Sequence, residues 1–120
     1  MAVRAVRGAI QLDHDERDHL LSGVTDLIKA VLDANGFSTD DLISMLFTAT
    51  PDLRSEFPAL AARELGIVDV PLMCAQEIDV VGAMPRVVRL MAHVETLRSK
   101  HEIQHVYLGG AAALRKDIAQ

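Results

Sequence analysis

The stretch AVRAVRGAIQLDHDERDHLLSGVTDLIKAVLDANG, residues 2–36, decides the fold, because it predicts a strand followed at once by a long helix. Residues 2–12 alternate loosely, which predicts a β-strand with Arg4 and Arg7 on opposite faces. Asp13 followed by Glu16 resembles a capping box that begins the helix. Asn35-Gly36 ends it, since glycine suits the left-handed C-cap. The apolar face of this helix comprises Leu20, Leu21, Val24, Leu27, Ile28, Val31 and Leu32.

Short apolar runs predict the other strands. LISMLFTAT at 42–50 is a continuous apolar run of strand length, most simply a buried strand. VPLMC at 70–74 and HVYL at 105–108 have the same character, and AAAL at 111–114 predicts a last short strand after the Gly109-Gly110 turn.

Two further helices are predicted between these strands, besides a helical turn that Ser38 caps. Pro58 stands at a first helical position, and ALAARELG then forms a short helix closed by Gly66. Pro85 opens a second helix that runs to about Leu97. Its apolar stripe is Val87, Leu90, Met91, Val94 and Leu97, with Arg86, Arg89 and His93 on the other side.

This alternation predicts a single α/β or α+β domain over residues 1–120, a usual domain length. Four or five strands with two substantial helices leave one sheet face poorly covered. A chain of this size also buries only about two-thirds of its unfolded surface. Packing of the uncovered face against other subunits is therefore expected.

Composition excludes several classes of protein. The net charge is −5 and only 3% of residues are aromatic, which disfavours nucleic-acid binding and base stacking. A single cysteine cannot form an internal disulfide. The first residues lack the apolar core of a signal peptide, and no apolar run reaches the ~18 residues of a membrane span. A cytoplasmic protein without membrane or nucleic-acid partners is expected.

Two arginines are the best candidates for an anion site. Arg7 stands mid-strand between Ala5 and Ala9, where small neighbours leave room for a ligand that a guanidinium could grip. A charge that protects an edge strand is the alternative. Arg89 has no Asp or Glu three or four residues away, so no local ion pair explains it. A solvated helix face is the alternative there.

The remaining reactive side chains give no catalytic pattern. Tyr107 and Cys74 are read from spacing alone as core residues. The five histidines lack metal-ligand spacing, and no Ser-His-Asp order, zinc signature or phosphate loop is present. Spacing alone predicts an anion site without a nucleophile or a general base.

Several separated motifs, in register along nearly the whole chain, resemble one family. They are RGAI at 7–10, TATPDL at 48–53, FPALAAREL at 57–65, the C-x-x-E of Cys74 and Glu77, PRVVRLM at 85–91 and HVYLGGAAALR at 105–115. Together they are similar to the monofunctional AroH-class chorismate mutases of bacteria.

The resemblance implies a mixed β-sheet with helices on one side, assembled as a homotrimer with sites at the subunit interfaces. It implies conversion of chorismate to prephenate, toward phenylalanine and tyrosine, with no metal and no cofactor. This Claisen rearrangement is intramolecular, so the missing nucleophile is expected. An acceleration of ~10⁶-fold needs about 8 kcal/mol, which positioning and preorganised electrostatics can supply.

The resemblance also implies the roles of individual residues. Arg89 would face the ether oxygen, Arg7 and Tyr107 a substrate carboxylate, and Glu77 the ring hydroxyl, with Cys74 nearby. The backbone of Met73, Cys74, Ala75, Gln76 and Glu77 would line the pocket. Arg86 receives no such role. The pocket walls and entrance would comprise Phe57, Ala59 and Arg63 of the adjacent subunit, with Leu114 and Arg115.

Three departures from some relatives concern the pocket mouth and the C-terminal tail. Leu60 stands where some members have lysine, Lys116 where proline is common, and the chain stops at Gln120. The alternatives in function are a trimeric ligand-binding or deaminase-type protein of similar architecture and a noncatalytic interaction module.

Overall fold

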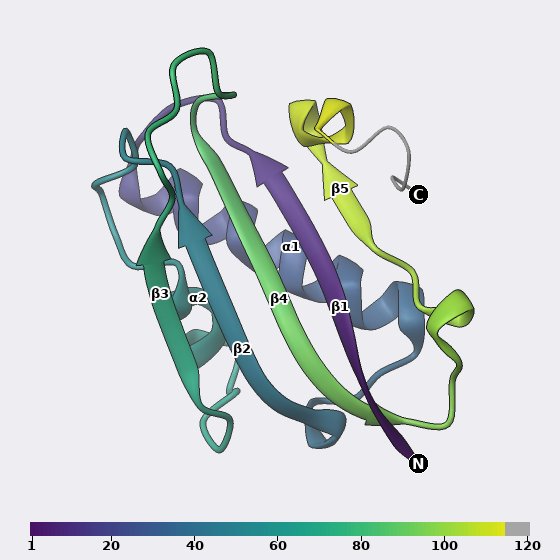
Figure 1. Cartoon of the computed structure of the whole chain (residues 1–120). Coiled ribbons are helices and arrows are strands. Elements are labelled where there is room, and N and C mark those ends of the chain that lie inside the picture. The colour runs from purple at the N-terminus through teal and green to yellow at the C-terminus, as the bar shows by residue number, and fades with distance from the viewer. Residues whose placement is uncertain (115–120) are drawn as a thin grey trace.

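The computed structural model describes residues 1–114, which form one five-stranded sheet with two α-helices (Figure 1). The strands are β1 (Ala2–Gln11), β2 (Leu42–Ala49), β3 (Leu72–Gln76), β4 (Val87–Thr96) and β5 (Val106–Leu108). Their order across the sheet is β3-β2-β4-β1-β5. β4 runs antiparallel to β1 and β2, whereas β3 and β5 pair parallel to β2 and β1. The expected mixed α+β sheet is confirmed.

Both helices, α1 (Arg17–Asn35) and α2 (Ala59–Glu64), cover the same face of the sheet (Figure 1). The predicted apolar face of α1 is buried apart from Leu32, which is partly buried and packed against the same core. Gly8 lets α1 approach β1 closely, because a Cβ there would lie 2.9 Å from Val31 Cγ2 and 3.0 Å from Leu27 Cδ1. The other face of the sheet, here called the open face, carries neither helix.

The ends of α1 confirm one predicted cap and correct the other. Gly36 has φ 65°, and its N–H turns back to the helix carbonyls as predicted. The helix begins after Glu16, however, and not at Asp13. Asp15 explains the delay: its carboxylate accepts the N–H groups of Arg54 and Ser55, so the segment before the helix is tied to a distant loop.

The predicted helix from Pro85 to Leu97 is wrong, because this segment forms β4. Its buried residues on the helix-covered side are Val88, Leu90, Ala92 and Val94, a period of two and not of 3.6. Leu97, the end of the expected apolar stripe, is 86% exposed. All ten residues of β4 pair with β1, and β2 pairs on the other side. Sheet pairing on both edges overrides the helical spacing.

Other predicted elements differ less. β3 extends to Gln76, two residues beyond the predicted strand, because the parallel ladder with β2 continues to Ala49. The predicted strand at 111–114 is wrong: Gly109–Ala113 is a 3₁₀ turn. Gly109 has φ 60° and lies against the Gln11 carbonyl, which turns the chain out of the sheet. The turn capped by Ser38 is confirmed, with a reciprocal capping box to Asp41.

The N-cap of α1 leads to a prediction about stability and pH. Hydrogen bonds from the backbone N–H groups of His19 and Asp18 lower the pKa of Glu16 below its ordinary value of 4.5. The ionised carboxylate therefore stabilises the folded state at neutral pH. Glu16→Ala should lower the melting temperature by a few degrees at pH 7, measured by circular dichroism.

The same carboxylate is protonated as the pH falls below 4.5 and through the lowered pKa, so the two melting temperatures should converge over that range. Asp13→Ala is the matched control, because within residues 1–114 the Asp13 carboxylate accepts no hydrogen bond. An equal loss in both variants, or a gap that stays constant with pH, would contradict this assignment of the cap.

Candidate active site

Arg89 lies near the centre of the open face. It stands opposite Ala9 of β1 and opposite Thr48 of β2, and Ala9 in turn pairs with Tyr107 of β5. Neighbouring strands lie about 4.8 Å apart, so these residues form one row across the sheet. The small side chain of Ala9 leaves space between the guanidinium of Arg89 and the ring of Tyr107.

Arg7 occupies the next row of the open face, opposite Met91. A hollow of about 190 Å³ is lined by Arg7, Thr48, Arg89 and Tyr107, together with apolar Leu46 and Met91. The arginine that the sequence singled out on β1 and the one on β4 therefore meet over the same cavity. Their common charge suits an anionic ligand.

Glu77 is the acidic partner of Arg89. It follows directly after β3, where its N–H donates to the Ala49 carbonyl at 2.9 Å. Arg89 Nε donates to Glu77 Oε2 at 3.0 Å. The sequence did not indicate this pair, because the two residues are 12 positions apart. Glu77 follows the end of β3, whereas Arg89 lies within β4. The Arg89 side chain is 42% exposed, so the pair contributes little stability and mainly orients the guanidinium.

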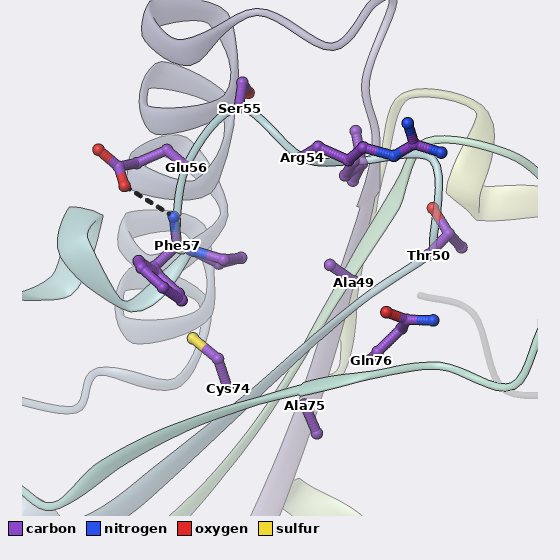
Figure 2. Close-up of a pocket in the computed structure, with 11 residues that line it drawn as sticks. Ala49, Thr50, Arg54, Ser55, Glu56, Phe57, Cys74, Ala75 and Gln76 are labelled. Atoms are coloured by element: carbon purple, nitrogen blue, oxygen red, sulfur yellow. Dashed lines mark hydrogen bonds between the residues drawn. The ribbon is translucent and has the colours of Figure 1, made fainter.

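A second hollow, of about 340 Å³, lies between β3 and the segment that precedes α2 (Figure 2). Phe57, Cys74, Ala75 and Gln76 are among its lining residues. Figure 2 shows the Cys74 thiol pointing toward the side of this hollow that carries Phe57. Side chains alternate along a strand, so Cys74 and Glu77 project to opposite faces of the sheet. Within one chain, Cys74 therefore lies in the second hollow, away from the Arg89 pair.

Phe57 and Met73 are exposed apolar side chains close to the β3 edge of the sheet. Phe57 is 70% exposed, and Met73, which pairs with Leu46 on the open face, is 65% exposed. Ala59, the first residue of α2, is half-buried against the helix-side core. Arg63 Nη1 donates to the carbonyls of Ile67 and Val68 at 3.1 and 3.0 Å, so this guanidinium also fixes the chain after α2.

Leu114 lies beside Tyr107, one of the residues that line the open-face hollow. It packs with Met84 and Tyr107 on a small cluster formed by Ala9, Val87 and Ala111, which covers part of the open face. The 3₁₀ turn after β5 thus gives Tyr107 an apolar support. Arg115, which the sequence also assigned to the site, lies outside the described residues.

Arg86 does not belong to either hollow, in agreement with the sequence analysis, but it has a structural role. Its φ is 56°, in the left-handed region, which costs a non-glycine residue about 1–2 kcal/mol. The backbone N–H of Arg86 donates to the Asp52 carboxylate at 3.0 Å, and Arg86 Nε donates to the Leu12 carbonyl at 2.9 Å. These bonds fix the start of β4, three residues before Arg89.

The structure thus separates the expected site residues into two groups. Arg7, Arg89, Tyr107 and Glu77 meet on the open face, whereas Phe57, Cys74 and Gln76 line the second hollow. Thr48, Leu46 and Met91 are lining residues that the sequence analysis did not single out. The alternation of β4 could have indicated Met91, since it places Arg89 and Met91 on one face, whereas Leu46 and Thr48 lie on β2 and join them only through strand pairing.

Residues 1–114 contain neither a metal-binding cluster nor a membrane-spanning helix. No group of His, Cys, Asp and Glu side chains there is arranged to hold a metal ion. Nor is any helix of that part long and apolar enough to cross a membrane.

Comparison with known proteins gives a consistent result. The family model of chorismate mutase type I matches residues 3–118. A protein named chorismate mutase AroH from Thermus thermophilus is 41% identical over 117 residues, covering 97% of this chain and 96% of the relative. Its counterpart from Bacillus subtilis is 38% identical over 120 residues, covering 99% and 94%.

The solved structure of a chorismate mutase from Clostridium thermocellum has the same fold. The TM-score is 0.90 at 42% sequence identity, with 92% of this chain and 98% of that chain covered.

Proposed function

The chain belongs to the chorismate mutase type I family and converts chorismate to prephenate, and we propose that the open-face hollow and the residues around Phe57 form its active site jointly, from two subunits of a homotrimer. The observation that carries this proposal is the meeting of Arg7, Arg89 and Tyr107 over one cavity, with Glu77 bonded to Arg89. A cytoplasmic location stays a prediction of the sequence.

The reaction calls for positioning and charge and not for a nucleophile. In a Claisen rearrangement one C–O bond breaks and one C–C bond forms within the same molecule, and no proton is transferred. The enolpyruvyl arm must be held over the ring, and negative charge grows on the ether oxygen as its bond lengthens. A preorganised cation beside that oxygen stabilises the transition state more than the substrate.

The hydrogen bonds of Arg89 support its role at the ether oxygen. Glu77 engages Arg89 Nε, and within residues 1–114 the terminal nitrogens of the guanidinium make no hydrogen bond, which leaves them for a ligand of the hollow that Arg89 lines. Arg7 and Tyr107, in the same cavity, would bind a carboxylate of the dianionic substrate. Glu77 would accept a hydrogen bond from the ring hydroxyl with its second oxygen.

The size of the open-face hollow supports a composite site. Pockets that enclose small ligands commonly measure about 300–1,000 Å³, and this hollow measures about 190 Å³. Phe57 and Met73, which family resemblance also assigns to the site, expose apolar surface at the β3 edge. An edge of one subunit docked on the open face of the next is a heterologous contact, which closes as a ring.

The first prediction concerns the reaction itself. Purified protein mixed with chorismate should lower the ultraviolet absorbance of chorismate and yield prephenate. Because no proton transfer limits the rate, kcat should vary little across neutral pH. Failure to consume chorismate would sink the assignment of substrate, and a bell-shaped profile in a folded protein would reveal an acid–base pair.

Arg89 should act on the transition state more than on substrate binding. Arg89→Ala should lower kcat by about 10²–10³-fold, as loss of an electrostatic donor typically does. Arg89→Lys should restore little, because a flexible ammonium does not reproduce the planar guanidinium. Steady-state kinetics with a check of assembly would measure both variants.

Arg4→Ala is the control for loss of an arginine. Arg4 lies on the same strand as Arg7 but on the helix-covered side, where its Nε donates to the Arg98 carbonyl. The Arg4→Ala variant should therefore have a kcat close to that of the wild type. If Arg89→Ala raised KM alone, Arg89 would only clamp the substrate, and the proposed mechanism would be wrong.

A subunit-mixing experiment tests the composite site. Arg89→Ala removes one half of the site, and Phe57→Asp places a negative charge in the other half, so each variant alone should be nearly inactive. Co-refolding equal amounts of the two variants should restore about one quarter of the sites. An active site needs an intact Arg89 from one subunit and an intact Phe57 from its neighbour, and each condition is met in half of the cases. Sedimentation should show trimers throughout. No recovery in mixed trimers would mean that each site lies within one chain.

A further inference from the structure

Thr48 makes the shortest contact to the Glu77 carboxylate. It stands on β2 directly opposite Arg89 and lines the same open-face hollow. Its hydroxyl Oγ1 donates to Glu77 Oε2 at 2.6 Å, and Arg89 Nε donates to the same oxygen at 3.0 Å. Thr48 therefore touches the ion pair on which the proposed mechanism depends.

The direction of this hydrogen bond follows from the groups involved. A guanidinium only donates and a carboxylate only accepts, so the threonine hydroxyl must donate to Glu77. A distance of 2.6 Å is typical of an O–H group bonded to a charged oxygen. Within residues 1–114 both hydrogen bonds of this carboxylate end on Oε2, which leaves Oε1 for a ligand.

Glu77 needs such an anchor because of its place in the chain. It follows the last residue of β3 and begins an exposed loop in which Ile78 is 86% and Val81 100% exposed. Two consecutive residues of β2 hold it: Ala49 accepts its backbone N–H, and Thr48 binds its side chain. Without the hydroxyl, the long side chain of Arg89 would be the one remaining hydrogen-bond partner of the carboxylate within residues 1–114.

We propose that Thr48 is a positioning residue, whose hydroxyl holds Glu77 so that the carboxylate engages Arg89 through Nε alone. This proposal rests on the roles proposed above for Glu77 and Arg89. A carboxylate released from Thr48 could turn to the terminal nitrogens of Arg89 and form the bidentate pair that these groups favour. Those nitrogens would then be unavailable to the ether oxygen, and Glu77 Oε1 unavailable to the ring hydroxyl.

Thr48→Val tests the proposal because valine has nearly the same shape and suits a strand, but lacks the hydroxyl. It should lower kcat about tenfold, the usual effect of losing one hydrogen bond to a charged group, with a smaller change in KM. Thr48→Ser keeps the hydroxyl and should retain most of the activity. Thr48→Ala also removes the hydroxyl and introduces a smaller side chain. It would be used in place of Thr48→Val if the valine variant does not fold.

Ser44→Ala is the matched control. Ser44 lies on the same face of β2 as Thr48. It pairs with His93 of β4, just as Thr48 pairs with Arg89, and its hydroxyl lies 3.2 Å from the His93 ring nitrogen Nδ1. It is four residues, or about 13 Å, from Thr48 along the strand. This variant should leave kcat unchanged, whereas equal losses at both positions would overturn the proposal in favour of a general need for polar strand residues.

A double-mutant cycle with Glu77→Ala separates positioning from direct action. If Thr48 acts through Glu77, Thr48→Val should change kcat less than twofold once Glu77 is alanine. A full tenfold loss in that background, or a kcat within twofold of wild type for the single variant, would overturn the proposal. Wild-type turnover of chorismate in the same assay shows separately whether the proposed site chemistry is in place.

Discussion

The antiparallel pairing of β4 with both β1 and β2 is the constraint on which the rest of the structure depends. It makes β4 the central strand, so its alternate side chains belong to two environments. Val88, Leu90 and Val94 join the core under α1, and Arg89 points to the open face. Since the register places Arg89 between Ala9 and Thr48, the same pairing that builds the core also positions the principal cation.

The electrostatic design of the open face follows from how that cation is held. Glu77 reduces the net charge of the pair, but it also restricts the rotation of a long side chain that is 42% exposed. In the proposed mechanism, binding through Nε leaves the other guanidinium nitrogens for charge that develops during the reaction. The loss of net charge is the cost of holding the cation in place. A charged group that must reorient during the reaction stabilises the transition state less than one already in position.

The division of the site residues between two hollows gives a physical reason for the proposed assembly. The open face lacks a covering layer and exposes Met73 beside Leu46, while Phe57 projects from the neighbouring edge. Burial of these apolar side chains by another subunit would be favourable and would enclose the ligand. A small domain, which alone buries only about two-thirds of its unfolded surface, would gain stability and a complete pocket from the proposed contact.

Local patterns in the sequence were sufficient for several parts of the fold. The strand at the N-terminus, the apolar face of α1, its Gly36 cap and the short helix after Pro58 follow from nearest-neighbour chemistry, which acts within one or two turns of chain. An uncovered sheet face was also expected from counting strands and helices, although that count included the segment from Pro85 to Leu97, which forms β4 and not a helix. The choice of Arg7, Arg89 and Glu77 as site residues came from separated motifs read together, whereas spacing alone reached only the two arginines.

Tertiary structure decided what depends on partners distant in the chain. The segment 87–96 has a helical spacing of apolar residues, and only pairing with two strands made it β4. Asp15, bound to a loop 39 residues away, moved the start of α1 to Arg17, with Glu16 as its N-cap. The contact of Thr48 with Glu77 and the separation of Cys74 from Arg89 exist only through strand register, because register sets which side chains share a face.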